Sequence, residues 1–245
     1  MLRLTVLGSG DAFNAGGSLH SCYLLEQGSE TLLLECGPSV LAAMRRFDLD
    51  PEVVDAVAVS HLHGDHFAGI PFLLLEYSVN SPRRRPLVIA GPPTTAERIE
   101  RAYASLYSEA RAGEIPFEID YRVLEPGSRF QLAGLSGEAF EVPHGAEPFC
   151  LGYRLEGGGS SLLFSGDSAW TEAFVEKSRG VDLFLCECCS LERPLPDHLS
   201  YGELIDNRAR LGCKRLLLTH LGAEMRVAED LALETADDGL VVELP

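Results

Sequence analysis

Short apolar runs alternate with segments of helical periodicity along the whole chain. Apolar runs of about four to eight residues between turn residues predict strands, and apolar positions three or four residues apart predict helices. We expect strands at residues 2–7, 21–26, 31–35, 53–60, 87–90, 117–123, 129–132, 139–142, 151–155, 161–164, 181–186, 215–219 and 240–243. Helices are expected at residues 39–47, 69–77, 94–110, 171–177 and 201–211.

Several predicted boundaries depend on residues with a defined conformational role. Pro38 stands at the start of the first helix, where its fixed backbone angle is suitable. Thr94 or Thr95 is expected to cap the helix at 94–110 by accepting a backbone N–H. Gly157-Gly158-Gly159 predicts the tight turn of a hairpin. Strands mixed with helices early and late predict an α/β fold with two sheets covered by helices on their outer faces.

Composition limits the class of protein. The 245 residues are enough for one large α/β domain or two small ones, and the 46% hydrophobic and 23% charged shares are ordinary for a soluble globular enzyme. No segment approaches the ~20 uninterrupted apolar residues of a spanning helix. The first residues lack the long apolar core of a secretory signal. We therefore expect no membrane contact.

Charge and cysteine content narrow the partners and the compartment. The net charge of −17 repels nucleic acid and anionic membranes at long range. The seven cysteines are an odd number without paired zinc-site spacing, so free thiols in a reducing cytoplasm are expected. Cys186, Cys188 and Cys189 could be soft metal ligands. They end an apolar run that predicts a buried strand, which favours buried thiols.

The strongest chemical signal is Ser60-His61-Leu62-His63-Gly64-Asp65-His66, directly after a predicted strand. Imidazole and carboxylate groups suit zinc, manganese or iron. In a tight loop, His61 and His63 can point one way and Asp65 and His66 another, which would supply two neighbouring metal sites. Solvated loop residues are the alternative, but four candidate ligands within six positions favour metal binding.

This run resembles the His-x-His-x-Asp-His motif of the metallo-β-lactamase superfamily. The resemblance continues downstream at His144, Asp167 and His220, each at or just past the end of an apolar strand. It implies a single domain over residues 1–245 with a four-layer αββα sandwich. It also implies two divalent cations, zinc foremost with manganese or iron as alternatives. The first would be held by His61, His63 and His144, the second by Asp65, His66 and His220, and Asp167 would bridge them.

The resemblance implies hydrolysis. Two cations about 3.5–4 Å apart can share a hydroxide, lower its pKa and polarise the oxygen under attack. The oxygen-reducing diiron relatives of this superfamily have a glutamate at the position that corresponds to His63. A histidine at this position resembles the hydrolases instead, so His63 favours hydrolysis over redox chemistry. A further histidine, His198, lies just before a predicted helix and resembles the acid–base histidine of the ribonuclease Z and phosphodiesterase branch. Glu187, at the end of the preceding strand, would orient it. The expected catalytic residues are Asp65, His198 and Glu187.

The substrate expected from these features is a small or cyclic phosphodiester. True ribonuclease Z enzymes resemble one another in a tRNA-binding arm between the third histidine and the bridging aspartate. Here residues 145–166 are taken up by one short hairpin, so structured tRNA is a poor candidate substrate. The alternatives are a dinuclear hydrolase of a lactone, thioester, sulfate ester or β-lactam, and a metal-binding accessory protein without catalysis. A homodimer is compatible with the sequence.

One basic cluster, Arg83-Arg84-Arg85, has two interpretations. Arginine pairs with phosphate in a bidentate manner, so the cluster could grip a phosphate beside the site. Its place in a proline-flanked loop favours ordinary solvated side chains instead.

Overall fold

The computed structural model describes residues 1–81, 83–108, 115–146, 148–192 and 195–245, and within them it has two mixed β-sheets of seven strands each. The first sheet has the order β14 (Val241–Leu244), β1 (Leu2–Gly8), β2 (Cys22–Gln27), β3 (Glu30–Leu34), β4 (Ala56–Ala58), β5 (Leu87–Gly91) and β6 (Ile119–Val123). The second has the order β13 (Glu234–Thr235), β12 (Arg215–Thr219), β11 (Leu183–Glu187), β10 (Ser160–Phe164), β9 (Cys150–Gly157), β8 (Leu135–Val142) and β7 (Arg129–Leu132).

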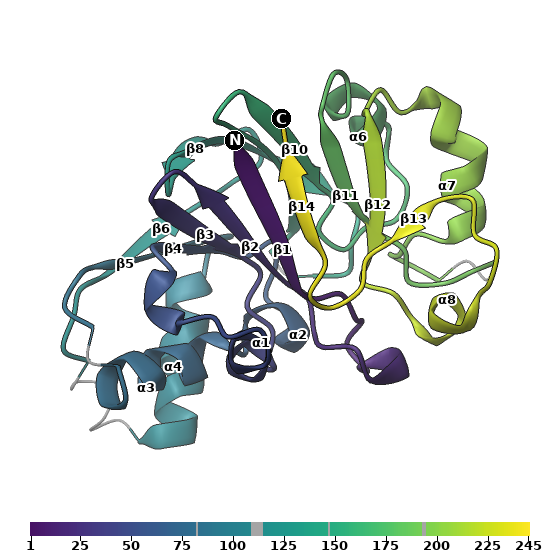
Figure 1. The fold of residues 1–245 in the computed structure, drawn as a ribbon. Helices are drawn as coiled ribbons and strands as arrows, with labels where there is room; N and C mark the ends of the chain where they lie inside the picture. Colours follow the sequence, from purple (N-terminus) through teal and green to yellow (C-terminus); the bar gives the residue numbers. More distant parts are fainter. Residues whose placement is uncertain (82, 109–114, 147, 193–194) are drawn as a thin grey trace.

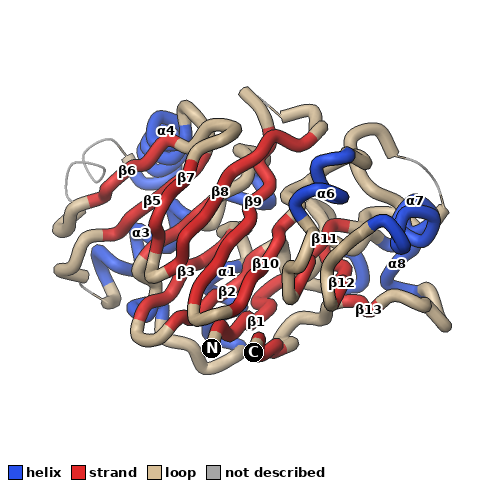
Figure 2. Tube along the Cα trace, turned by 90° about the horizontal axis from the view of Figure 1, so that it is seen from above, coloured by secondary structure: helices blue, strands red, loops and turns tan. Residues whose placement is uncertain are grey.

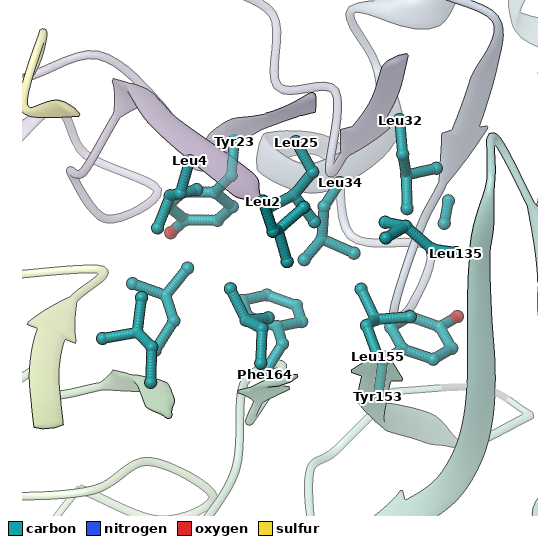
Figure 3. Close-up of a cluster of buried hydrophobic side chains, with 14 of the residues drawn as sticks. Leu2, Leu4, Tyr23, Leu25, Leu32, Leu34, Leu135, Tyr153, Leu155 and Phe164 are labelled. Carbon is teal, nitrogen blue, oxygen red and sulfur yellow. The ribbon is translucent and has the colours of Figure 1, made fainter. Parts of the chain in front are cut away.

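The two sheets pack face to face on a shared apolar core (Figure 3). Alternate residues of each strand point into this layer, as in Leu2 and Leu4 of β1. The rings of Tyr23 and Phe164 lie 5.5 Å apart across the layer. The Tyr153 hydroxyl crosses it to donate a 2.7 Å hydrogen bond to the Val59 carbonyl. Such contacts fix the relative position of the two sheets.

Helices cover the outer face of each sheet (Figures 1 and 2). The first sheet packs against α1 (Val40–Arg46), α3 (Ile70–Val79) and α4 (Thr95–Tyr107) in a second apolar cluster. The second sheet packs against α6 (Glu172–Lys177), α7 (Tyr201–Asn207) and α8 (Ala223–Val227) in a third. The layers therefore run helix, sheet, sheet, helix, which confirms the predicted αββα fold.

The parallel strands of both sheets end at the same edge. β3 and β4 are parallel neighbours in the first sheet, and β10, β11 and β12 are parallel neighbours in the second. Glu187 is the last residue of β11, and the chain leaves the other four strands into the segments that carry Glu35, His61, Asp167 and His220. The topology therefore brings residues that are far apart in sequence to one place. Among the described residues, no helix is long and apolar enough to cross a membrane.

Several predicted boundaries differ from the structure. The strand expected at 53–60 is reduced to β4, because Pro51–Val53 forms a 3-10 turn and Ser60 leaves the ladder to donate its N–H to Glu35. The helix expected at 201–211 ends at Asn207 and continues as a 3-10 turn, Arg208–Arg210. The helix expected at 94–110 ends at Tyr107, because Ser108 leaves it with φ of 85°, and residues 109 and 110 lie outside the described residues.

Other local predictions fail or are refined. Thr94 has a left-handed backbone and makes no cap hydrogen bond, and the Thr95 hydroxyl donates to the Pro92 carbonyl instead, so neither caps α4 as expected. Short elements not expected from the sequence are α2 (Gly64–Phe67), α8 and β13. The predicted glycine turn is confirmed: Gly158 and Gly159, both with positive φ, connect β9 to β10.

Candidate metal centre

Three imidazoles form the first group of candidate ligands. Ligand atoms of His61, His63 and His144 all lie within 4.8 Å of one another. His63 Nδ1 is 3.1 Å from His144 Nε2. His61 is fully buried, and its Nε2 has no hydrogen-bond partner within the described residues. A buried nitrogen without a partner is costly unless a ligand satisfies it, so this group fits a cation.

The second group combines two carboxylates with two imidazoles. Ligand atoms of Asp65, His66, Asp167 and His220 also lie within 4.8 Å of one another. His66 Nε2 is 3.1 Å from both Asp65 Oδ2 and Asp167 Oδ2. His220 Nε2 is 3.4 Å from the same two oxygens. Asp167 also faces the first group, because its Oδ2 is 3.9 Å from His61 Nε2.

The pKa values of these side chains depend on burial and on the charges of their neighbours. Burial raises the pKa of Asp167, but the charges of His220 and His66 outweigh burial and bring the pKa well below its usual range. Burial lowers the pKa of His66, but the Asp167 and Asp65 carboxylates bring it well above its usual range. Burial lowers the pKa of His61 and keeps that ring neutral. The carboxylates are thus ionised, and nitrogen and oxygen donors of this kind suit zinc, manganese or iron.

The local backbone places these side chains. The predicted tight loop contains one helical turn, α2, with His63 at its N-cap and both Asp65 and His66 on it. His220 has a left-handed backbone, with φ of 52° directly after β12. Non-glycine residues rarely adopt this conformation, and such strain concentrates at functional sites.

Residues behind the histidines select which ring nitrogen faces inward. Ser60 Oγ is 2.9 Å from His61 Nδ1, and the Asp197 carbonyl is 2.9 Å from His144 Nδ1. In both rings Nε2 is therefore left for a ligand. Such outer partners orient metal-binding imidazoles in many proteins. The Asp197 contact has no signal in the sequence, because it depends on a backbone carbonyl 53 residues from His144.

Glu35 lies beside the second group of candidate ligands and was missed in the sequence interpretation. It is fully buried, has φ of 61°, and its Oε2 lies 3.5 Å from His66 Nδ1. Its Oε1 accepts the Ser60 N–H at 2.9 Å. Burial raises the pKa of Glu35, and the His66 ring opposes this effect. A signal was present, because Glu35 follows an apolar strand in the same way as Asp167.

His198 and Glu187 lie together beside the metal-binding groups. His198 Nδ1 is 2.8 Å from Glu187 Oε1, and a ligand atom of His198 lies within 4.8 Å of those of His144 and Asp167. Burial lowers the pKa of His198, but the hydrogen bond and charge of Glu187 outweigh burial and raise it. Glu187 is itself buried, and its Oε1 accepts the Ser168 N–H at 2.7 Å.

The arginine cluster has no place in this site. Arg83 is buried and donates to the carbonyls of Val54, Arg85 and Pro86, with its guanidinium over the Tyr77 ring. Arg85 pairs with Asp55. These residues precede β5, at the end of the first sheet opposite His61. Arg83 and Arg85 are therefore not placed to bind a phosphate at this site. The favoured interpretation, solvated side chains, is also wrong for Arg83, because its side chain is buried and binds backbone carbonyls around β4 and β5.

The segment between His144 and Asp167 is short, as expected. Apart from residue 147, which lies outside the described residues, it consists of loop, β9, the glycine turn and β10. The cysteines form no disulfide: each of the seven is a free thiol. Cys186 and Cys188 are buried, and Cys189 is partly exposed.

Comparison with known proteins agrees with this geometry. A family model described as the beta-lactamase superfamily domain matches residues 30–221. The chain is 34% identical over 228 residues to an uncharacterized protein of Mycobacterium tuberculosis, covering 90% of this chain and 81% of that protein. It is 26% identical over 291 residues to a ribonuclease Z of Agathobacter rectalis, covering 97% and 93%. The structure of human tRNase Z, short form, matches with a TM-score of 0.81 at 21% identity over 99% of both chains.

The chain therefore belongs to the metallo-β-lactamase superfamily and has the fold of its ribonuclease Z-like branch. The family and these similar proteins indicate a hydrolase of the metallo-β-lactamase type. The structure brings all seven predicted ligands together in two groups that could bind metal. The identity and number of the ions remain predictions.

Proposed function

We propose that the protein is a metal-dependent phosphodiesterase that acts on a small or cyclic phosphodiester. The observation that carries this proposal is the position of the His198–Glu187 pair, directly beside two adjoining groups of metal-binding side chains. An acid–base histidine at that place suits a reaction in which an alkoxide leaves.

In this proposal, seven side chains hold the metal ions. The first group, His61, His63 and His144, offers three nitrogens, and the second group, Asp65, His66 and His220, offers two nitrogens and a carboxylate. Asp167 is suitably placed to serve both groups. Two divalent ions bound there, zinc foremost, would supply a water nucleophile of lowered pKa and polarise the phosphoryl oxygen.

His198 holds and moves a proton in this scheme. A carboxylate can only accept, so Glu187 Oε1 takes the hydrogen bond from His198 Nδ1–H. When the ring is protonated, its second proton is on Nε2, on the side of the ring away from Glu187. From there it is donated to the leaving oxygen, and the cationic ring becomes neutral. The Ser168 N–H holds the Glu187 carboxylate in place during this transfer.

Small substrates are favoured over structured tRNA. The alignment to the A. rectalis ribonuclease Z spans 291 positions against a chain of 245 residues, so that enzyme has segments that this chain lacks. The net charge of −17 offers no broad basic surface for an RNA backbone.

The deciding experiment is a substrate screen of purified, metal-loaded protein. Bis(p-nitrophenyl) phosphate is expected to be hydrolysed faster than a lactone, a thioester or an aryl sulfate. Faster turnover of one of the last three would replace the phosphodiesterase by another dinuclear hydrolase. Binding of metal without turnover of any of the four would favour a metal-binding accessory protein.

A further inference from the structure

One thiol lies beside the metal-binding groups without belonging to either of them. Ligand atoms of Cys189, His198 and His220 lie within 4.8 Å of one another. Cys186 and Cys188 are buried in the third apolar cluster instead. Cys189 is therefore the member of this cysteine run that faces histidines.

The backbone holds Cys189 between the two histidines. Its N–H donates to the Leu199 carbonyl at 3.1 Å, which fixes it beside His198. The preceding N–H, of Cys188, donates to the Thr219 carbonyl at 2.9 Å, which fixes it beside His220. The rings of His198 and His220 are stacked, with 5.5 Å between centroids and 8° between planes. Hydrogen bonds to the backbone thus hold the three potential ligands close together before any ion binds.

An unpartnered buried nitrogen points to a ligand at this place. The His220 side chain is 96% buried, and its Nε2 faces Asp65 and Asp167. Its Nδ1 is buried and makes no hydrogen bond of standard geometry within the described residues. A ligand atom of His220 lies within 4.8 Å of the Cys189 sulfur, and Nδ1 is the ring nitrogen that does not face the two carboxylates. His198 also has a nitrogen to offer, because only its Nδ1 is used by Glu187.

We propose that Cys189, His198 and His220 form a third, inhibitory metal position for a borderline-soft divalent cation such as Zn²⁺ or Co²⁺. One thiolate and two imidazoles are a donor set that these ions prefer. One such ion would be bound by Sγ of Cys189, Nε2 of His198 and Nδ1 of His220. This position differs from the two groups described above, because its sulfur belongs to neither.

Binding at this position releases protons and removes the acid. The thiol loses its proton, His220 loses the proton on Nδ1, and His198 gives up the Nε2 proton that it would otherwise donate to the leaving oxygen. His220 would be shared between this position and the second group, with one ring nitrogen for each. We expect this position to be filled only at metal concentrations above those that fill the first two sites. The inhibition rests on the proposed function, but the existence of the site does not.

Cobalt tests the site without any activity assay. Metal-free protein is titrated with Co²⁺ in buffer without thiol reductant, and absorbance is followed in the near ultraviolet, where sulfur-to-cobalt charge transfer appears. The wild type is expected to develop this band after the first two equivalents. Cys189→Ser is expected to lack it, and the matched control Cys188→Ser to keep it. A wild type without the band at excess cobalt, or a Cys189→Ser variant that retains it, would overturn the proposal.

Zinc tests the inhibitory role. With a phosphodiester that has an alkoxide leaving group, excess Zn²⁺ should lower wild-type turnover by about 10²-fold, the scale of a lost general acid. Cys189→Ser should resist this inhibition. Equal inhibition of both proteins would show that the site does not regulate turnover. If no phosphodiester is hydrolysed, the proposed function fails, and the cobalt band still decides whether the site exists.

Discussion

His198 Nδ1 lies 2.8 Å from Glu187 Oε1, and the same oxygen accepts the backbone N–H of Ser168 at 2.7 Å. The carboxylate is buried, so it has little water to compete with the imidazole for its charge. The pair is anchored by β11, a central strand of the second sheet, rather than by the loop that carries His198. The orientation of the His198 ring is therefore set by the sheet. The predictions on catalysis depend on this pairing of His198 with Glu187.

The first prediction concerns metal content. Protein purified without chelator should contain close to two metal ions per chain, because two adjoining ligand groups are present. Asp167→Ala should lower occupancy of both positions, since Asp167 Oδ2 faces His66, His220 and His61. Elemental analysis measures this. Asp182→Asn is a matched control, because that buried carboxylate binds Ser161 and Lys214 at the far end of β11. A ratio at or below one after reconstitution would count against the dinuclear centre.

The second prediction concerns Glu35. In Glu35→Gln the amide oxygen can still accept the hydrogen bond from the Ser60 N–H, and the amide nitrogen then points toward His66 Nδ1. That favours the tautomer with its proton on Nε2, the nitrogen that faces Asp65 and Asp167. Metal affinity of the second group should fall by about 10–100-fold, as for other outer partners of metal ligands.

Competitive chelator titration measures the effect of Glu35→Gln. Glu76→Gln is the control, because Glu76 is also buried but pairs with Arg45 on α1. Folding stability of the metal-free protein should not fall, because burial raises the pKa of Glu35 and the amide avoids the cost of a buried charge. Unchanged metal affinity would mean that Glu35 has only a structural role.

The sequence predicted the strands that carry the site, because apolar runs of ordinary strand length dominate them. It predicted Asp167 and His220 through the family resemblance, supported by their place at or just past the end of such a run. Glu35 obeys the same rule, but a single glutamate after a strand is also typical of a solvated turn. The α2 turn was missed because a helix of four residues is too short to show a period. The position of Cys189 depends on its own hydrogen bond to the Leu199 carbonyl and on that of Cys188 to the Thr219 carbonyl. Both are tertiary contacts, which have no local signal in the sequence.

The third prediction concerns RNA. Processing of precursor tRNA should be weak or absent, because the segment between His144 and Asp167 forms a hairpin and the net charge is −17. A ribonuclease Z with its arm serves as the positive control in the same buffer at physiological salt. Efficient cleavage by this protein would mean that another surface replaces the arm.

The fourth prediction concerns pH. Glu187 raises the pKa of His198 above its usual value of 6.5. General acid catalysis requires the protonated ring, so it is present below this pKa and is lost as pH rises through it. In Glu187→Gln the negative charge is gone, the pKa of His198 falls, and the alkaline limb of kcat should move to lower pH. Profiles of wild type and variant on one alkyl phosphodiester measure the shift. An alkaline limb at the same pH in both would separate Glu187 from the titration of His198.

The last prediction concerns His198 itself. His198→Ala should leave the bound metal unchanged, because His198 belongs to neither of the two main ligand groups. Turnover of alkyl phosphodiesters should fall by about 10²–10⁴-fold, the usual effect of losing a general acid. The defect should be smaller for p-nitrophenyl esters, because p-nitrophenolate leaves without protonation. Comparing kcat for the two kinds of ester in the variant separates proton donation from a structural effect, which would slow both equally. Wild-type turnover on alkyl phosphodiesters would show that His198 is an ordinary loop residue, and the assignment would then return to a hydrolase of the metallo-β-lactamase type.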